Sequence, residues 1–237
     1  MSNASTDRNG KNQKAVTIRC RFCDVAKGRS GLPQDHVLAE NVSYVAIPSV
    51  GSLVPGWVLI LPRKHQLNLS SEYLVDQLES FRVTIASKLA SKFRKRVRLF
   101  EHGPAKFGSL TGCGVDHAHM HLVPVDDDLS QWFGYVDGNS AWQSCRLSEV
   151  CSMVGNSEYL LYANDATSAD PICKLAILQQ PASQFFRRCV ALAVGQPERF
   201  DYKAYPSLHN VTLTNAILRE AGSIEQQTNG IRHAVAS

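Results

Sequence analysis

Three of the eight histidines of the chain alternate with apolar residues in one short stretch. They are His117, His119 and His121, and Ala118 and Met120 lie between them. Successive side chains of an extended strand point to opposite faces, so this spacing places the three imidazole rings on one face. Imidazole can act at neutral pH as a nucleophile, a proton donor or a metal ligand. The stretch therefore predicts a chemically active strand, and the apolar residues between the histidines argue against a merely solvated one.

The residues just before the histidines are Gly112, Cys113 and Gly114. Glycine has no Cβ and accepts backbone conformations that other residues avoid. This short segment therefore predicts a place where the backbone approaches a bound group closely.

Two cysteines near the start of the chain, Cys20 and Cys23, have the Cys-x-x-Cys spacing. Such a pair can be a redox pair, half of a zinc site or a coincidence. A redox pair needs strand–helix–strand structure directly around it, whereas a polar segment, residues 27–34, follows here. We therefore favour half of a zinc site, which needs two more ligands from elsewhere in the chain.

The elements that must position these residues are short strands and one long helix. Residues 42–47 and 57–61 are rich in β-branched and aromatic residues, and the Pro- and Gly-containing segment between them predicts a hairpin. Residues 70–93 lack Pro and Gly and repeat apolar residues every three or four positions, which predicts an amphipathic helix with Ser70 or Ser71 as N-cap. Residues 96–101 then read as a strand, with Val97 and Leu99 on one face.

The second half of the chain shows weaker patterns. Residues 158–163 and 174–179 read as two strands joined by a polar turn, and residues 185–194 as a helix with Ser183 as N-cap. Residues 210–220 predict a short last helix, and both ends of the chain are polar. This order of elements predicts an α+β fold, in which a helix packs on one face of an antiparallel sheet.

The composition is that of an ordinary globular protein. Of the 237 residues, 44% are hydrophobic and 19% are charged, and the net charge of +4 gives only a mild preference for anionic partners. The basic run at residues 92–98 predicts a solvated helix end rather than a nucleic-acid patch. No apolar run is long enough for a membrane span, and seven cysteines without an apolar leader favour reduced thiols in the cytoplasm.

The stretch from His117 to Val123 resembles the signature of the histidine triad (HIT) superfamily of nucleotide hydrolases and transferases. The cysteine pair, the segment from Gly56 to His65 and the long helix also follow the order found in that family. The resemblance spans residues 18–125 and implies a HIT-like antiparallel sheet with a long helix packed on it. The rest resembles longer bacterial members with a C-terminal α/β extension. We accordingly expect a disordered tail (1–16), a nucleotide-binding catalytic domain (17–125), an extension packed on this core (126–222) and a flexible tail (223–237).

The resemblance implies cleavage of a phosphoanhydride or phosphoramidate at the α-phosphorus of a nucleotide, as in dinucleoside polyphosphate hydrolases. His119 would attack phosphorus and form a nucleotidyl-histidine intermediate, which splits one difficult displacement into two easier ones. His121 would hydrogen-bond the phosphate or orient the site. The backbone amides of residues 112–114 could stabilise negative charge on the phosphoryl oxygens.

The resemblance also implies a structural zinc ion. In zinc-containing members, two N-terminal cysteines, the histidine after the Pro-x-x element and the first triad histidine bind the metal. Carried over by motif, these ligands are Cys20, Cys23, His65 and His117. A closed set of two cysteines and two histidines would tie the N-terminal segment to the sheet and leave His119 free. The alternative is that the cysteines are simply buried thiols.

The chain departs from the family pattern in places that bear on its substrate. Many members have Gly-Gln-Ser or Gly-Gln-Thr before the triad, where this chain has Cys113-Gly114, and Glu101 and His102 stand where many small members have an Asn-containing turn. Glu101 and His102 are therefore candidate substrate contacts. In the C-terminal region, three residues at the predicted helix N-terminus could hold phosphate, namely Ser183, Gln184 and Arg187. The alternative is that the neighbouring phenylalanines are core and the arginines form a solvated face.

Three functions remain open at this point. The first is a nucleotide hydrolase or nucleotidyltransferase acting through His119, and the second is a phosphorylase-like or uridylyltransferase-like enzyme with a phosphate acceptor. The third is a zinc-stabilised nucleotide-binding module without turnover. In each case the expected partner is a nucleotide or nucleotide conjugate, with no membrane and no strong signal for nucleic acid. Small family members commonly pair into dimers, so a homodimer is one expectation. The alternative is that the long C-terminal region covers that interface.

Overall fold

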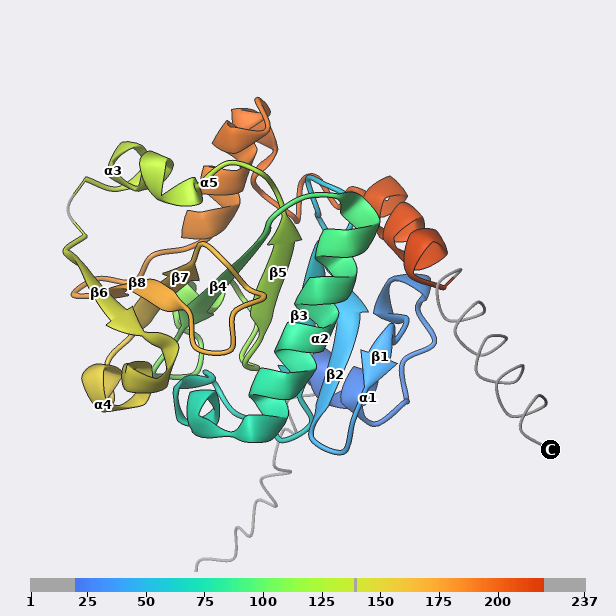
Figure 1. Ribbon diagram of the computed structural model, residues 1–237, viewed down its shortest axis with the longest axis horizontal. Coiled ribbons are helices and arrows are strands. Elements are labelled where there is room, and N and C mark those ends of the chain that lie inside the picture. The colour runs from blue at the N-terminus through green and yellow to red at the C-terminus, as the bar shows by residue number, and fades with distance from the viewer. Residues whose placement is uncertain (1–19, 139, 220–237) are drawn as a thin grey trace, which may run out of the picture.

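One antiparallel sheet runs through the whole molecule (Figure 1). The computed structural model describes residues 20–138 and 140–219. The eight strands lie in the order β1-β2-β3-β5-β4-β7-β8-β6. Their bounds are β1 Ala39–Glu40, β2 Tyr44–Pro48, β3 Val58–Pro62, β4 Val97–Gly103, β5 Met120–Pro124, β6 Trp142–Arg146, β7 Tyr159–Ala163 and β8 Ile172–Ile177. Every neighbouring pair is antiparallel, which confirms the predicted α+β fold.

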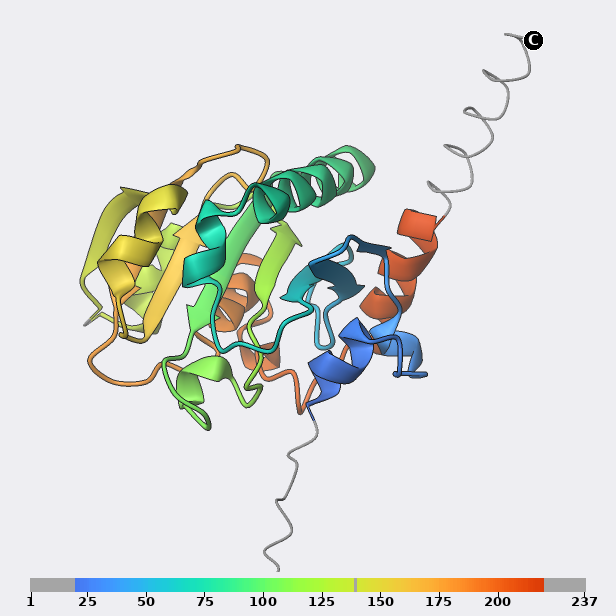
Figure 2. The same cartoon turned by 90° about the horizontal axis from the view of Figure 1, so that it is seen from below.

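Helices cover both faces of this sheet, as Figure 2 shows. Helix α2 (Asp76–Phe93) lies on one face, where its apolar stripe packs against β3, β4 and β5. Helices α1 (Arg21–Ala26) and α5 (Phe185–Ala193) pack on the other face, each in a separate cluster of buried side chains. Two short helices, α3 (Phe133–Val136) and α4 (Val150–Val154), and a last helix over residues 208–219 complete the described α-helices.

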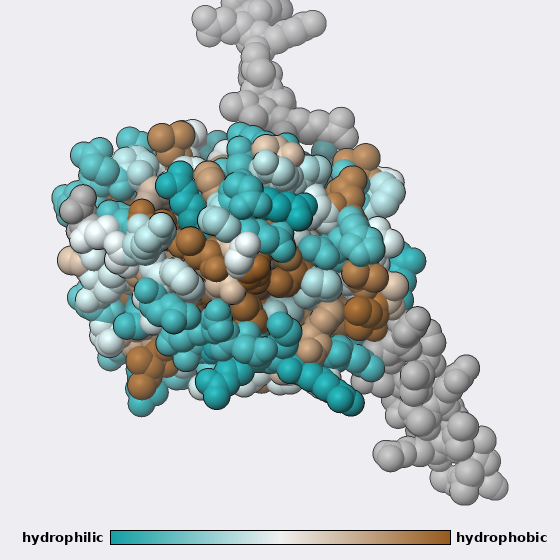
Figure 3. Space-filling view, turned by 90° about the horizontal axis from the view of Figure 1, so that it is seen from above, coloured by the Kyte–Doolittle hydropathy of each residue, from teal (hydrophilic) through white to brown (hydrophobic). Residues whose placement is uncertain are grey.

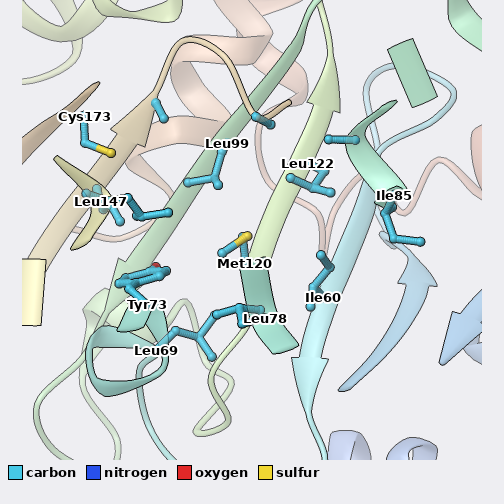
Figure 4. Close-up of a cluster of buried hydrophobic side chains, with 14 of the residues drawn as sticks. Ile60, Leu69, Tyr73, Leu78, Ile85, Leu99, Met120, Leu122, Leu147 and Cys173 are labelled. Atoms are coloured by element: carbon cyan, nitrogen blue, oxygen red, sulfur yellow. The ribbon is translucent and has the colours of Figure 1, made fainter. Parts of the chain in front are cut away.

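The core beneath α2 is made by alternate residues of the central strands (Figure 4). Met120 and Leu122 of β5 lie here with Leu99 of β4 and Ile60 of β3. Ala118, just before β5, belongs to the same cluster. Because side chains alternate, the histidines at 117, 119 and 121 are placed on the opposite face. The predicted separation of an apolar face from an imidazole face is thus confirmed, although β5 itself begins only at Met120.

The predicted helix over residues 70–93 is wrong at its start. A 3₁₀ turn, Ser70–Leu74, comes first, and α2 begins after Val75, which is the N-cap and makes no side-chain capping bond. The reason is a tertiary contact: the Leu69 amide and the Tyr73 hydroxyl both donate to the carboxylate of Glu101 on β4. These bonds fix the turn against the sheet, and a continuous helix could not make them.

The C-terminal strands continue the sheet rather than forming a separate one. Strand β7 pairs with β4, with His102 opposite Leu160, and β8 and β6 follow at the edge. Strands β7 and β8 and helix α5 were predicted to within two residues, whereas β6 was not predicted. Ser183 is not the N-cap of α5: Gln184 occupies that position with φ 54° and no side-chain capping bond. The predicted tails, residues 1–16 and 223–237, lie outside the described residues.

The surface seen from above carries hydrophobic residues gathered in its middle and hydrophilic residues around them (Figure 3). Among the helices of residues 20–138 and 140–219, none combines the length and the apolar character that crossing a membrane requires.

Candidate active site and metal centre

The imidazole face of the sheet forms one wall of a pocket. His102, His119 and His121 line it together with apolar side chains of α1, β2 and β3 and with Arg187 of α5. Among the described residues, no carboxylate lines this pocket, whereas two arginines do. The remaining lining residues are Arg21, Phe22, Ile47, Pro48, Ser49, Val50, Leu59, Cys113, Val115 and Tyr202. A pocket with this charge distribution suits an anionic ligand that also has an apolar part.

His119 is held in one tautomer. Its Nδ1 lies 2.8 Å from the carbonyl oxygen of His117, which can only accept, so Nδ1 carries the proton. The lone pair is then on Nε2. Burial lowers the pKa of His119, while the carbonyl of His117 acts in the opposite direction. The neutral ring with a free Nε2 lone pair is the form that a nucleophilic histidine requires.

His121 is held in the other tautomer. The indole N–H of Trp57 lies 2.9 Å from Nδ1 of His121, and because that indole can only donate, Nδ1 accepts and Nε2 carries the proton. The ring stacks on Phe100 at 4.5 Å between centroids. Burial holds the pKa of His121 well below its usual range, and His119, His102 and Arg187 nearby act in the same direction. His121 is therefore a neutral donor through Nε2.

His102 is a fourth histidine at the same pocket. The backbone amide of Phe186 donates to its Nε2 at 3.4 Å, which leaves the proton on Nδ1. Nδ1 is buried and has no hydrogen-bond partner in the described part of the chain. Burial lowers the pKa of His102 to about 3, so the ring is neutral.

Arg187 brings a buried positive charge to the pocket. Its guanidinium donates to the carbonyl oxygens of Phe200, at 2.8 Å, and Gly51, and lies 4.8 Å from the ring centroid of Trp57. Burial lowers the pKa of Arg187 to about 10, which still leaves it charged at neutral pH. No ion pair to a carboxylate is formed by Arg187 within the described residues. Its charge is therefore solvated by dipoles and aromatic rings but not neutralised.

A second cluster shares His117 with the triad. The ligand atoms of Cys20, Cys23, His65 and His117 all lie within 4.8 Å of one another. Sγ of Cys20 is 3.4 Å from Nδ1 of His117, and Sγ of Cys23 is 3.2 Å from Nδ1 of His65. The sequence separates these residues by up to 97 positions, and the fold brings all four together.

This cluster has the chemistry of a zinc site. Bond lengths of about 2.0 to 2.3 Å to a tetrahedral zinc ion put neighbouring nitrogen and sulfur ligands roughly 3.5 Å apart, close to the separations found here. His117 also donates through Nε2 to the carbonyl of Pro62 at 2.9 Å, the outer bond that orients many metal-binding histidines. Burial lowers the pKa of His117 to about 4, so its ring is neutral, as a ligand must be.

Glu101, a predicted substrate contact, does not line the pocket. It is fully buried on the α2 face, where its carboxylate accepts from the Leu69 amide at 2.7 Å and from the hydroxyls of Tyr73 and Tyr159. Strand alternation explains this, because its neighbour His102 takes the pocket face. The structure gives Glu101 the role of anchoring the turn before α2 to β4, and the expectation of a substrate contact is corrected.

The predicted phosphate contacts before the triad and at α5 are only partly brought to the pocket. Cys113 lines it, with φ 56°, whereas Gly112 and Gly114 flank it from the adjoining turn. Gln184 lies behind Cys113, and its backbone amide donates to Sγ of Cys113 at 3.2 Å. The first backbone amides of α5 are therefore already bonded to Cys113 and His102. Ser183, like Gln184, is not among the pocket-lining residues. Of the three α5 candidates, only Arg187 reaches the pocket.

Several residues that line the pocket or bind one of its histidines were not predicted from the sequence. Trp57 was seen only as part of a strand, although an indole N–H at a buried position needs a partner. Tyr202, whose hydroxyl donates to the carbonyl of Cys113 at 2.9 Å, carried no local signal. The apolar wall comes from α1, β2 and β3, whose runs of buried residues gave no indication of which side would face a ligand.

A family model described as "Protein similar to CwfJ C-terminal" matches residues 7–135 of this chain, which is more than half of it. A HIT-like protein of Mycoplasma genitalium is 28% identical over 126 residues, covering 52% of this chain and 84% of that protein. The adenosine 5′-monophosphoramidase of Saccharomyces cerevisiae is 28% identical over 115 residues, covering 47% of this chain and 65% of that protein.

Solved structures similar to this chain include a HIT family protein from Bacillus anthracis, with 21% identity and a TM-score of 0.38 over 45% of this chain and 73% of that one. A zinc-bound histidine triad family protein from Mycobacterium smegmatis is 17% identical, with a TM-score of 0.34 over 44% of this chain and 73% of that one.

Proposed function

Because this chain belongs to the histidine triad superfamily, within the family of proteins similar to the CwfJ C-terminal region, we propose that it cleaves nucleotides at their α-phosphorus. The bond broken is a phosphoanhydride or a phosphoramidate, and the enzyme is a hydrolase or a nucleotidyltransferase. One observation carries this proposal: His119 stands in a pocket that no described residue lines with a carboxylate, with Nδ1 bonded to the His117 carbonyl and Nε2 left unprotonated. The adenosine 5′-monophosphoramidase among the relatives supports a nucleotide substrate.

In the first step, the lone pair on Nε2 of His119 attacks the α-phosphorus. The nitrogen–phosphorus bond forms while the bond from phosphorus to the leaving group breaks, and the leaving group departs with the bonding electron pair. The ring keeps its Nδ1 proton and becomes positively charged. The carbonyl of His117, 2.8 Å from Nδ1, stabilises that charge. His121 donates its Nε2 proton in a hydrogen bond to a non-bridging phosphoryl oxygen.

In the second step, a water molecule attacks the phosphorus from the side that the leaving group has vacated. The oxygen–phosphorus bond forms, the nitrogen–phosphorus bond breaks and its electron pair returns to Nε2. The water gives up its proton to the solvent, and the nucleoside monophosphate is released. If inorganic phosphate takes the place of water, the product is a nucleoside diphosphate.

We assign Cys20, Cys23, His65 and His117 to a structural zinc ion. With four protein ligands the ion is closed to substrate, so its contribution is to hold α1 against the sheet. Phe22 of α1 makes an edge contact with the ring of His119 at 5.6 Å between centroids, so the metal would also help to keep the pocket wall in place.

The proposal is tested by incubating the purified chain with diadenosine tetraphosphate and with adenosine 5′-phosphoramidate, each with and without inorganic phosphate. Release of AMP indicates hydrolysis, and release of ADP in the presence of phosphate indicates transfer. An alkaline quench followed by mass spectrometry detects the nucleotidyl adduct on the peptide that contains His119. Absence of both product and adduct with both substrates would rule out the enzyme and leave a nucleotide-binding module.

The matched variants are His119→Ala and His209→Ala. The first removes the nucleophile and is expected to abolish turnover, by a factor of about a thousand or more, and to leave the melting temperature nearly unchanged. The second removes an exposed histidine of the last helix and should have no effect. Turnover at the wild-type rate in His119→Ala would contradict the assignment.

A further inference from the structure

We propose that α5 completes an anion subsite beside His119, formed by Arg187 and His102, that receives the leaving-group phosphate. The preferred substrates are then nucleotide phosphoanhydrides, not phosphoramidates, and this inference rests on the proposed function for its chemistry. The subsite combines one residue from within the matched residues 7–135, His102, with one from the C-terminal extension, Arg187.

Arg187 provides the charge. Only 3% of the residue is exposed, and its guanidinium is held by two backbone carbonyls and by the rings of Trp57 and Tyr202. Those carbonyls bind Nε and Nη2, and Nη1 has no hydrogen bond to any described residue. A buried cation is normally paired with an acid because desolvation is costly. A fixed cation at a pocket wall with no carboxylate among its described lining residues is therefore suited to bind an anionic ligand.

His102 provides a second, independent indication. Its Nδ1 is a buried donor without a partner in the described residues, and buried polar atoms in native proteins are nearly always bonded. The amide of Phe186 at 3.4 Å from Nε2 fixes the proton on Nδ1, so the ring can donate but not accept there. A phosphate oxygen supplies the missing acceptor, whereas a protonated amine does not.

The two groups are positioned by one element. Phe186 and Arg187 are consecutive residues of α5, and the ring of Phe186 stacks on Phe100 at 4.8 Å between centroids, next to His102 and His121. The first turn of α5 thus sets the tautomer of His102 and delivers the guanidinium to the same wall. Lys203 lies over the ring of Tyr202, which lines the pocket, 5.9 Å from its centroid, and adds a further positive charge.

The subsite has a direct chemical consequence. When a phosphoanhydride is cleaved, negative charge grows on the departing phosphate as the phosphorus–oxygen bond breaks. Arg187 and His102 would stabilise this charge in the transition state, which raises kcat. A departing amine instead needs a proton on its nitrogen before the phosphorus–nitrogen bond breaks, and it leaves as a neutral molecule. The same guanidinium would therefore repel the protonated nitrogen and would not stabilise the departing amine.

The first test measures binding and requires no turnover. Isothermal titration calorimetry compares AMP with α,β-methylene-ADP, which carries one more phosphate and cannot be cleaved between its phosphorus atoms. Wild-type protein is expected to bind the methylene analogue at least about tenfold more tightly than AMP. Arg187→Gln should lose this advantage, while Arg188→Gln, which removes the exposed neighbouring arginine of the same helix, should keep it. A wild-type protein without the advantage, or an Arg187→Gln variant that retains it, overturns the subsite.

The second test measures kcat/KM for diadenosine tetraphosphate and for adenosine 5′-phosphoramidate. Arg187→Gln should lower the value for the phosphoanhydride by about 10- to 100-fold and that for the phosphoramidate by less than about threefold. Equal losses on both substrates would overturn the inference without affecting the nucleophile. If the wild-type protein cleaves neither substrate, the proposed enzyme fails, and the binding measurement still decides the subsite.

Two variants of His102 keep the test decisive should Arg187→Gln fail to fold. Asn places an amide near the position of Nδ1 and can still donate, whereas Leu cannot. His102→Leu is expected to lose most of the preference for the diphosphate analogue, and His102→Asn to restore it. The same preference in both variants would overturn the role of Nδ1.

Discussion

The indole N–H of Trp57 donates to Nδ1 of His121 at 2.9 Å, and this one bond decides which nitrogen of His121 faces the pocket as a donor. Trp57 immediately precedes β3, and His121 lies opposite Leu59 in the β3–β5 pairing. The contact thus depends on the register of two strands that are far apart in the sequence.

We expect Trp57→Phe to lower kcat without unfolding the protein. The phenyl ring fills most of the indole volume but lacks the N–H, so His121 can adopt the wrong tautomer. Loss of one oriented donor in a transition state typically costs about 10- to 1,000-fold in kcat, and we expect a value within this range. Steady-state kinetics with diadenosine tetraphosphate would measure it.

Trp142→Phe is the matched control for that variant. Trp142 stacks on Phe133 at 4.2 Å between centroids, and its indole nitrogen is buried without a partner among the described residues. Removing this N–H should leave kcat unchanged. An equal loss of activity in both variants would show that aromatic packing, and not the bond to His121, explains the effect.

Cys20→Ser is expected to remove zinc and to lower thermal stability. Serine is a poor zinc ligand, so the closed site would lose both a bond and the tie between α1 and the sheet. A loss of about 3 kcal/mol corresponds to roughly 6 to 12 °C in melting temperature for a chain of this size. Plasma emission spectroscopy would give the zinc content and calorimetry the melting temperature.

Cys151→Ser, at a half-buried cysteine outside the cluster, should change neither. One zinc ion per chain persisting in Cys20→Ser would refute the metal assignment.

The buried carboxyl of Glu101 should make folding stability depend on pH. Burial raises its pKa to about 7, against 4.5 for an unperturbed glutamic acid, although bonds from Tyr159, Tyr73 and Leu69 oppose the shift. The folded state therefore binds the proton more tightly, so the contribution of Glu101 is fully present below pH 4.5 and is lost as the pH rises through 7. The loss amounts to roughly 3 kcal/mol.

Glu101→Gln isolates this effect, because the buried histidines titrate alike in both proteins and cancel in the difference. Urea unfolding at several values between pH 4.5 and 8 should show the wild type losing stability relative to Glu101→Gln as the pH increases. A difference independent of pH would show that the Glu101 carboxyl has an ordinary pKa.

Gly103→Ala is expected to destabilise the protein by about 2 to 4 kcal/mol. A Cβ at Gly103 would lie 2.2 Å from the ring of Tyr159, which is fully buried and donates to Glu101 at 2.6 Å. The ring would have to move and the bond would be broken. Gly134→Ala in α3, where no atom lies within 4 Å of the added Cβ, is the control and should be close to neutral. Thermal unfolding of both variants would measure the difference.

Local patterns predicted most of the frame that positions the site. Alternation around the histidines separated the imidazole face from the core. The apolar repeat within residues 70–93 located α2 apart from its first turn. The same reasoning could have placed Glu101 correctly. Val97 and Leu99 were assigned to one face of β4, and strand alternation puts Glu101 on that same face, which is the core.

The contacts that depend on strand order could not be predicted in this way. The pairing of β4 with β7 and the placement of α5 over the imidazole face join segments that are 56 to 84 positions apart. Nothing in the sequence near His102 indicates that the amide of Phe186 will bind its Nε2. Likewise, the break at Val75 comes from Glu101, 26 positions later, and not from any helix-stopping residue.

The position of β7 also limits how the protein can be shortened. In the sheet, β4 lies between β5 and β7, so a fragment that ended near residue 135 would leave the backbone of β4, Val97–Gly103, as an open edge. All seven residues of β4 are buried in the intact chain. A strand of this length with one unpaired edge is a template for intermolecular pairing. The half of the chain that resembles its relatives would therefore tend to aggregate by itself, and the extension protects it by pairing with that edge.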